Sequence, residues 1–227
     1  MRRVVLLSLL LSVASAGLLG AVQAGQQSGG GEIAVTLDLS NQKSQFAVWL
    51  SDTAQTYRGE LFVTRKVGSK GLGNRRGNLD DKLGGARLSA LPVWAWMRGV
   101  LDEHGNPYPS KQHPLPDAVT GATPHGQPFT CRGQVPDELT GTSCIVWVEI
   151  NASFDKNDAH HYSWYRGQPS LIYRGTLDLA RPGGDEVNLE LVGHGSVDGH
   201  DGAIDPDLAT ITTARTLART IRAVYVP

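Results

Sequence analysis

Short runs of β-forming residues alternate with turn signals along most of the chain. In the run Ile33–Leu39, large apolar side chains occupy every second position, which is typical of a strand with one buried face. The 27 glycines and 12 prolines fall mostly between such runs, and helical periodicity is scarce. The pattern predicts a mostly β fold, an antiparallel β-sandwich with long loops and a short helical element, rather than repeated βαβ units. The predicted strands are Ile33–Leu39, Phe46–Leu50, Glu60–Val67, Pro128–Cys131, Ser143–Ile150, Leu171–Leu179 and Val187–Val192.

The run Ser143–Ile150 differs from the others because it is apolar on both sides. Ile145 and Trp147 alternate with Val146 and Val148, so neither face is polar over most of its length. Strands that are apolar on both sides are usually covered on both faces. We therefore expect this run to be a central strand of its sheet.

Two segments do not fit a simple strand pattern. Leu91–Met97 follows a loop rich in glycine and charged residues, and predicts a short helix or an irregular anchor that buries Trp94. Near the C-terminus, apolar residues between Ala214 and Tyr225 have helical three-and-four spacing, whereas Ile221–Val226 also suits a strand. We expect a helical turn that leads into a closing strand.

The N-terminus has the parts of a secretory signal peptide. Met1–Arg3 is basic, Val4–Leu19 is apolar or small, and Val22–Ala24 provides small residues before a cleavage site. The apolar run is short for a membrane span, and the segment Gly25–Gly31 that follows is rich in Gly, Gln and Ser. We expect a signal peptide over residues 1–24, a flexible linker over 25–31 and one β-sandwich domain over 32–227. The protein would be periplasmic or secreted, without stable membrane insertion.

The net charge indicates which partners to expect, and the cysteine content indicates the redox state of the two thiols. The net charge is -1 and no basic run would follow a phosphate backbone, so nucleic acid is not an expected partner. Cys131 and Cys144 flank a predicted hairpin and lack the Cys-x-x-Cys spacing of a redox-active pair. In an oxidising compartment we expect them to form a structural disulfide, which would contribute about 3 kcal/mol in the chain-entropy model.

The segment Asp117–Pro124 predicts a tight turn that presents a threonine. Gly121 allows a positive φ at little steric cost, and Pro124 keeps Thr123 out of a helix. The side chain of Asp117 can bond to nearby backbone N–H groups. The same composition is typical of an ordinary hairpin turn, so a purely structural role is the alternative.

This segment also resembles the acceptor sequence Asp-x-x-Ser/Thr-Gly-Ala-Thr, on which bacterial flavin transferases attach FMN in extracytoplasmic electron-transfer subunits. Every fixed position matches, at Asp117, Thr120, Gly121, Ala122 and Thr123. The resemblance implies FMN joined covalently to Thr123 through a phosphoester. It covers only seven of the 227 residues, so it implies nothing about the fold of the rest of the chain.

A longer resemblance spans most of the mature chain. Its landmarks are Ala47–Asp52, Leu61–Thr64, Leu91–Trp94, the segment from Asp117 to Thr123, Val148–Asn151 and Gly167–Tyr173. In these the chain resembles a bacterial family of periplasmic proteins of unknown function (domain of unknown function 2271). The resemblance implies an immunoglobulin-like fold. It also implies two partners, a flavin transferase and a membrane-bound redox protein of the PepSY type. The chain departs from the family's pattern at Phe129–Gly133 and Asp158–His161.

Two loops concentrate histidines and acidic residues, at Asp155–His161 and His194–Asp207. If the loops meet in space, His160, His194 and His200 are the candidate metal ligands, because imidazole suits zinc and similar ions. Neither loop matches an EF-hand or a His-Glu-x-x-His motif. Solvated polar loops are therefore the alternative.

No catalytic constellation is recognisable in the sequence. There is no Gly-x-Ser-x-Gly elbow, P-loop or dinucleotide fingerprint, and Ser170 and Asp178 have no evident partner. The aromatic cluster Tyr162–Tyr165 would suit a glycan or a flavin ring. Two functions fit these observations. One is a non-catalytic redox carrier with FMN on Thr123, acting in extracytoplasmic electron transfer. The other is a binding or assembly module for a metal, a glycan or a membrane protein, in which the turn from Asp117 to Thr123 is unmodified.

Overall fold

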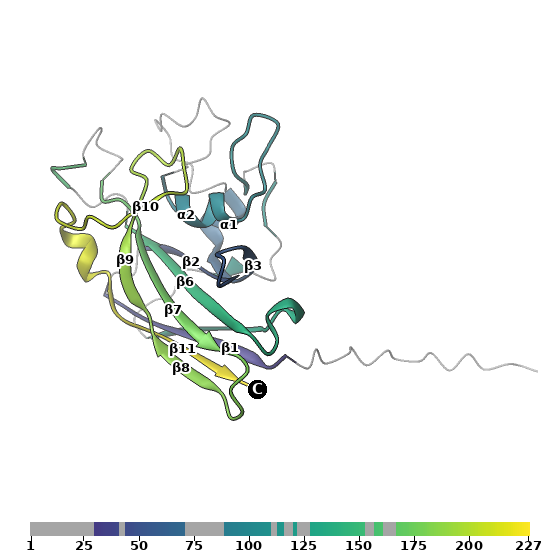
Figure 1. Cartoon of the computed structure of the whole chain (residues 1–227). Coiled ribbons are helices and arrows are strands. Elements are labelled where there is room, and N and C mark those ends of the chain that lie inside the picture. The colour runs from purple at the N-terminus through teal and green to yellow at the C-terminus, as the bar shows by residue number, and fades with distance from the viewer. Residues whose placement is uncertain are drawn as a thin grey trace, which may run out of the picture.

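Two β-sheets packed face to face form the protein in the computed structural model (Figure 1). The structure describes residues 30–40, 44–70, 89–109, 113–115, 120–121, 128–152, 157–160 and 167–227. Within these residues the fold is mostly β with two short α-helices, so the prediction of a β-sandwich is confirmed. Its immunoglobulin-like character stays a prediction. The signal peptide and most of the predicted linker lie outside the described residues.

The smaller sheet has four strands, and the larger has seven. In order across the smaller sheet they are β5 (Phe129–Gln134), β1 (Glu32–Leu39), β11 (Ala218–Val226) and β8 (Asp185–Asn188). In order across the larger sheet they are β10 (Ile204–Asp205), β9 (Glu190–Gly195), β7 (Leu171–Asp178), β6 (Ser143–Asn151), β2 (Gln45–Asp52), β3 (Tyr57–Thr64) and β4 (Thr120–Gly121). Among the described strands, β4 pairs in parallel with β3, and the other pairs are antiparallel.

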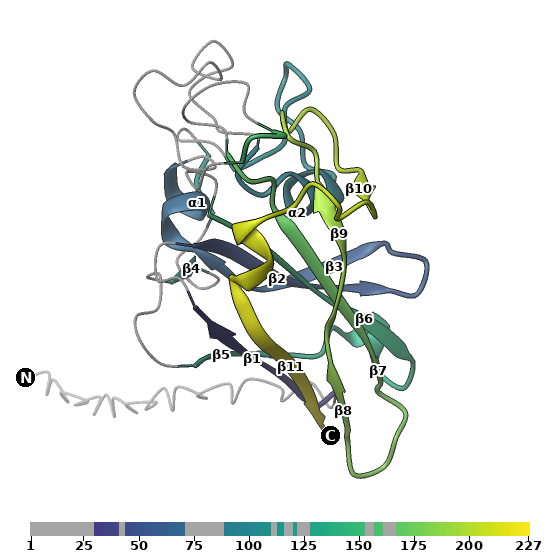
Figure 2. The same ribbon diagram turned by 90° about the vertical axis from the view of Figure 1, so that its left-hand side faces the viewer.

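The central strands of the seven-stranded sheet, β2 and β6, are buried on both faces. The inner face of this sheet meets the four-stranded sheet in a core that contains Val146 and Val148, whereas its outer face packs against a second core that contains Trp147. The helices α1 (Arg65–Lys70) and α2 (Pro92–Met97) lie by this second core (Figures 1 and 2). The strand β6 lies between β7 and β2, which confirms the prediction of a central strand apolar on both sides.

Tryptophans fill the second core. Trp94 on α2 is fully buried, as the sequence predicts, and the helix begins with Pro92 at a position where the missing N–H costs nothing. The rings of Trp49 and Trp147 stack with centroids 6.0 Å apart. Trp147 donates its indole N–H to the Ser51 hydroxyl at 2.8 Å, so this buried donor is satisfied. The aromatic cluster Tyr162–Tyr165 lies outside the described residues.

Two predicted strands differ most from the structure in their bounds. The run Val187–Val192 is divided between β8 and β9, which belong to different sheets, and the chain crosses between them at Leu189. The Leu189 N–H donates to the Ile221 carbonyl at 2.8 Å, and the Leu189 side chain is buried between the sheets. Because Leu189 is apolar like its neighbours, the sequence pattern does not reveal the crossover. The predicted strand Glu60–Val67 ends at Thr64, and α1 follows. The C-terminal prediction is confirmed, because the 3-10 helix Thr213–Thr216 precedes β11.

The cysteines do not flank a hairpin, so this part of the prediction is wrong. Cys131 lies on β5 and Cys144 on β6, and the two strands belong to different sheets because the turn around Pro136 carries the chain across the core. Both thiols are buried in the inter-sheet core and both are free in the structure. The disulfide stays a prediction.

Among the helices of the described residues, none has the length and apolar character needed to cross a membrane.

Candidate functional site

The middle of the proposed flavin-acceptor motif lies in an edge strand. Thr120 and Gly121 form β4, which pairs with Val63 and Thr64 of β3 at one edge of the seven-stranded sheet (Figure 2). The other predicted residues of the motif, Asp117, Ala122 and Thr123, lie outside the described residues. The structure therefore describes the Thr-Gly pair in the middle of the motif, and the conformation of the rest stays a prediction.

Packing explains why a glycine stands at position 121. A Cβ atom there would lie 2.5 Å from Cε2 of the Phe62 ring, which is closer than real contacts allow. The neighbouring Thr120 packs against Gly68 of α1, where a Cβ atom would lie 2.6 Å from the threonine Cγ2. The Thr-Gly pair of the motif thus has a structural role in this fold, whether or not the following threonine is modified.

An aromatic cluster lies beneath β4. The rings of Phe46 and Phe62 stack with centroids 5.1 Å apart, and Phe129 approaches them with centroid distances of 5.5 Å and 4.6 Å. Phe46 is fully buried, whereas Phe129 on β5 is only half-buried. Phe62 is therefore the ring in contact with Gly121, and Phe129 is the more exposed member of the cluster among the described residues.

The histidine loops meet at the other edge of the same sheet. The rings of His160 and His194 are 5.6 Å apart between centroids, so two of the three predicted metal ligands lie together. His194 Nε2 lies 3.7 Å from Asp205 Oδ2. The third candidate, His200, is exposed, and its backbone N–H donates to Asp198. Asp205 thus occupies the place beside His194 that the sequence analysis gave to His200.

The two histidines are held by different partners. His160 Nε2 lies 2.7 Å from the Thr210 hydroxyl, and His194 Nδ1 lies 2.9 Å from the Gly195 carbonyl. Burial lowers the pKa of His160, the nearby His194 lowers it further, and Asp205 opposes both effects. Within the described part of the chain, no group of three His, Cys, Asp or Glu side chains has the spacing of a metal site. The metal therefore stays a prediction.

A buried hydrogen-bond network of amide and hydroxyl groups holds the loop that carries His160. Asn157 donates to the Gln168 side chain at 2.8 Å and to the Thr210 carbonyl at 3.0 Å, and Gln168 donates to the hydroxyls of Thr212 and Thr213. Asn157 and Gln168 are almost completely buried. Because buried amides must be paired, this network fixes the loop that presents His160.

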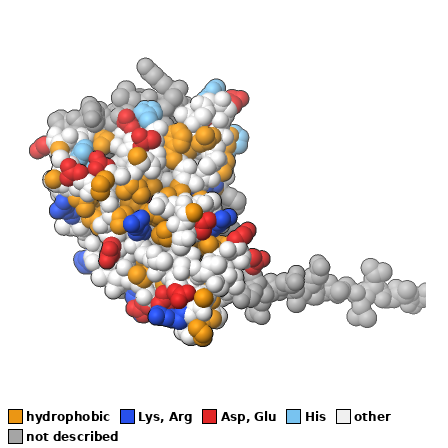
Figure 3. All heavy atoms as spheres, viewed as in Figure 1, with side chains coloured by type: hydrophobic (Ala, Val, Ile, Leu, Met, Phe, Trp, Pro, Cys, Tyr) orange, Lys and Arg blue, Asp and Glu red, His pale blue; other side chains and the backbone are white. Residues whose placement is uncertain are grey.

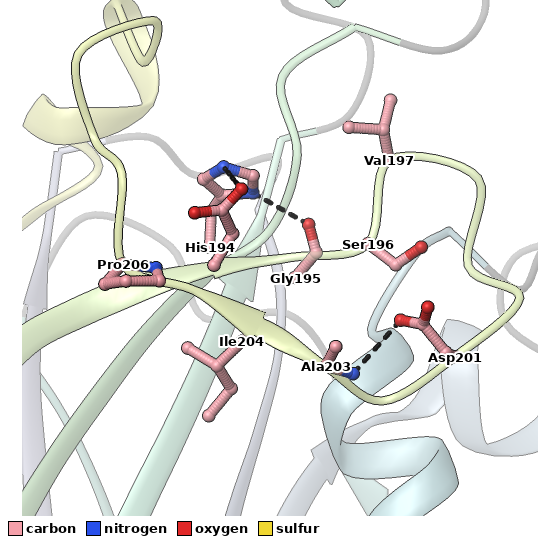
Figure 4. Close-up of a pocket in the computed structure, with 9 residues that line it drawn as sticks. His194, Gly195, Ser196, Val197, Asp201, Ala203, Ile204 and Pro206 are labelled. Carbon is pink, nitrogen blue, oxygen red and sulfur yellow. Dashed lines mark hydrogen bonds and ion pairs between the residues drawn. The ribbon is translucent and has the colours of Figure 1, made fainter.

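The pocket beside His194 has a volume of about 460 Å³ (Figure 4). It lies along the hairpin from β9 to β10, and Figure 3 shows acidic and histidine side chains gathered on this part of the surface. Apolar and polar side chains both line it: His194, Gly195, Ser196, Val197, Asp201, Ala203, Ile204, Asp205 and Pro206.

Glu149 is a functional candidate that the sequence analysis missed. Its side chain on β6 is 0 % exposed, and its carboxylate accepts hydrogen bonds from the backbone N–H groups of Val93 and Trp94 at 3.2 Å and 2.7 Å. It also accepts from the Ser170 hydroxyl at 2.6 Å. Burial raises the pKa of Glu149 to about 7, although each of the three donors lowers it. The sequence signal that could have revealed Glu149 is its position as an acidic residue in the run Ser143–Ile150, which is otherwise apolar on both faces.

The pairing of Ser170 with Glu149 gives Ser170 the partner that the sequence did not reveal. Both side chains are fully buried, so a substrate has no access to the serine in this arrangement. Gly195 packs directly against both, because a Cβ atom there would collide with the Ser170 hydroxyl and lie 3.2 Å from Glu149 Oε1. The pair therefore joins α2, the start of β7 and the end of β9, which lines the pocket.

No family model matches the chain, and comparisons with curated proteins and with solved structures also find no match. The resemblance to the periplasmic family of unknown function stays a prediction.

Proposed function

We propose that the protein is an exported, non-catalytic redox carrier that holds FMN covalently on Thr123. The observation that carries this proposal is the position of β4. The Thr-Gly pair of the acceptor motif is an edge strand held against β3 and α1, and Thr123 follows Gly121 by two residues. An acceptor threonine that follows an anchored edge strand remains close to the protein while a transferase binds the turn.

The residues near β4 fit a flavin. Phe62 lies directly beneath Gly121, and the half-buried Phe129 extends the aromatic surface toward the edge of the sandwich. A planar aromatic ring favours stacked or edge contacts with such side chains. The outward part of this surface gives an attached isoalloxazine ring a place to lie.

The covalent step requires only a nucleophilic hydroxyl and an activated flavin donor. The Thr123 oxygen would form a bond to the FMN phosphorus of a flavin dinucleotide, the phosphoanhydride bond would break, a nucleoside monophosphate would leave, and the hydroxyl proton would be lost to a base or to solvent. When bound, FMN supplies one-electron and two-electron transfer, a chemistry that belongs to the cofactor. The chain contributes the anchored acceptor, and Asp117 would help to orient the turn.

The proposed role as a redox carrier requires two protein partners. A flavin transferase would modify the exported chain, and a membrane-bound redox protein would exchange electrons with the flavin in the periplasm. Export is supported by the signal-like residues 1–24, and the resemblance to the periplasmic family supports the same pair of partners.

Intact-mass measurement tests the proposal. Protein exported from a host that expresses the cognate flavin transferase should gain the mass of one FMN less one water, and Thr123→Ala should abolish the gain. Thr130→Ala, at an exposed threonine on β5, is the matched control and should be modified like the wild type. An unmodified wild-type mass, obtained while the same transferase modifies a known acceptor, refutes the proposal.

A second candidate function is a binding module, and the pocket beside His194 favours it. In that case the turn at Asp117 to Thr123 is structural, in agreement with the packing of Gly121 against Phe62. The two functions would use different edges of the seven-stranded sheet.

A further inference from the structure

The α2 segment (residues 89–98) is attached to the outer face of β6 by two polar side chains of that strand. Glu149 accepts two backbone N–H groups at the start of α2, and Asn151 donates to the backbone carbonyls of Ser89 and Ala90 at 2.9 Å and 2.7 Å. Both side chains are buried. These four hydrogen bonds join the backbone of the segment to the sheet, so the segment can leave β6 only when they break.

Apolar side chains of the same segment favour the closed arrangement. Leu91, Val93 and Trp94 are fully buried in the second core. Burial of side chains of this size stabilises the closed state at every pH. An open state of the segment is therefore a minor one, of the kind that native-state hydrogen exchange detects.

Polar atoms at this contact oppose the apolar packing. Among the residues that the structure describes, those that are buried without a hydrogen-bond partner include the indole N–H of Trp94, the hydroxyl of Ser89 and Oδ1 of Asn151. A buried polar group without a partner has lost its hydration without compensation, so each of these atoms favours an open segment that water can reach. The contact is thus less favourable than its apolar side chains alone indicate.

Glu149 is the titratable group at the centre of the contact. Its three hydrogen-bond donors are uncharged, and its neighbours across the sheet are the apolar Ala47 and Ile172. Titratable side chains on the surrounding elements are engaged elsewhere, namely Arg98 and Tyr57 beside Glu60, Arg174 over the Trp147 ring and His194 beside Asp205. Burial raises the pKa of Glu149 to about 7, and the three donors lower it. Water in an open state would return this pKa toward its ordinary value of 4.5.

We propose that the α2 segment is a pH-controlled lid, whose opening from β6 admits water to Glu149 and Ser170 and becomes more frequent as Glu149 ionises. The closed state holds the carboxyl proton more tightly than the open state, so it loses relative stability as pH rises from about 4.5 to about 7. Across this whole window the opening constant should rise by up to about 300-fold, and between about pH 5 and about pH 8 it should rise by about 70-fold. Neither Glu149 nor the α2 segment belongs to the acceptor motif, so the lid can be tested without a flavin.

Native-state hydrogen exchange of the full mature chain, followed by ¹H–¹⁵N NMR, measures the opening. The amide of Ala95 is the probe, because it donates to the Leu91 carbonyl within the segment rather than to Glu149. Its protection factor, which corrects for the intrinsic pH dependence of exchange, should fall about 70-fold between about pH 5 and about pH 8. A small opening exposes little surface, so low urea should hardly change this exchange, whereas the amides of β6 should respond fully. Equal free energies of exchange and equal urea dependence for Ala95 and for β6 would mean that the segment opens only by global unfolding, and would overturn the lid.

Matched variants separate Glu149 from the rest of the contact. Glu149→Gln stays neutral, so its Ala95 protection should change by less than about threefold over this pH range, whereas Glu190→Gln, at an exposed position on β9, should behave like the wild type. Ser170→Ala removes a donor that lowers the pKa of Glu149, so the fall in protection should extend to higher pH than in the wild type. Ser89→Ala removes a buried hydroxyl without a partner and should raise the protection at every pH. A fall of less than about threefold in the wild type, or the same fall in Glu149→Gln as in the wild type, overturns the proposal.

Discussion

Replacing Glu149 by glutamine should remove a pH-dependent cost of folding. The buried carboxyl has a pKa of about 7 in the folded protein, against an ordinary value of 4.5, so the folded state holds this proton more tightly than the unfolded state. As pH rises from about 4.5 to about 7, the unfolded chain loses the proton first and stability falls. At about 1.4 kcal/mol per pH unit, the whole window corresponds to a cost of about 3 kcal/mol. Above about pH 7 the cost is constant.

The glutamine side chain in this variant is neutral and has the shape of the protonated Glu149 carboxyl group. Its amide can donate to the Ser170 hydroxyl and accept from the Trp94 N–H, so two of the three hydrogen bonds survive. The variant does not titrate at this position. The free energy of unfolding of Glu149→Gln, less that of the wild type, should therefore rise by most of about 3 kcal/mol between about pH 5 and about pH 8.

Urea unfolding at several pH values, followed by the fluorescence of the buried tryptophans, measures this difference. His160 titrates in the same range with the opposite sign, because its lowered pKa makes stability rise as pH increases through about 6.5. That contribution is common to both proteins and cancels in the difference. Glu190→Gln, at an exposed position on β9, is the control and should show no such pH dependence. A pH-independent difference between Glu149→Gln and the wild type would refute the argument from burial.

Three further predictions concern the core and the histidine pair. In the reduced protein, Cys131 and Cys144 should react with a thiol reagent only as the protein unfolds, because burial raises the pKa of each to about 12, and fast labelling of the folded protein would contradict this. Ser51→Ala should lower the free energy of unfolding by about 1–3 kcal/mol in urea titrations, since it leaves the buried indole N–H of Trp147 without an acceptor, and an unchanged midpoint would show that water replaces the hydroxyl. An NMR titration of the His160 ring should give a midpoint below 6.5, and a midpoint above that value would show that the attraction of the neighbouring carboxylate outweighs burial.

Strand periodicity predicted much of the fold because burial on a sheet repeats every two residues. The alternation in Ile33–Leu39 and the two-sided apolar run at Ser143–Ile150 correspond to β1 and to the central β6. The same signal does not say which sheet a strand joins. Leu189 is apolar like its neighbours, although the chain changes sheets there, and only the distant Ile221 carbonyl that accepts its N–H reveals the crossover.

The candidate sites were less predictable, because they depend on contacts between distant segments. The sequence placed His160 and His194 among possible ligands, and the fold brings their rings together. It did not distinguish Asp205 from His200, which are equally polar members of one loop, because the choice depends on the short antiparallel pairing of β10 with β9. Glu149 was hidden for the same reason: its three donors come from α2 and from the start of β7.

The seven-stranded sheet separates the proposed flavin acceptor from the pocket beside His194. The β4 edge carries Thr120 and Gly121 of the acceptor motif, the β10 edge lines the pocket, and five strands lie between them. The middle strands β6 and β2 are buried on both faces, so a change at one edge has to displace packed side chains before it reaches the other. Asp205→Asn should therefore leave FMN attachment unchanged when the intact mass is measured. Loss of FMN attachment in this variant would mean that the two edges are coupled through the central strands. Glu149 is then the first residue to examine, because it lies on β6 and contacts the pocket's Gly195.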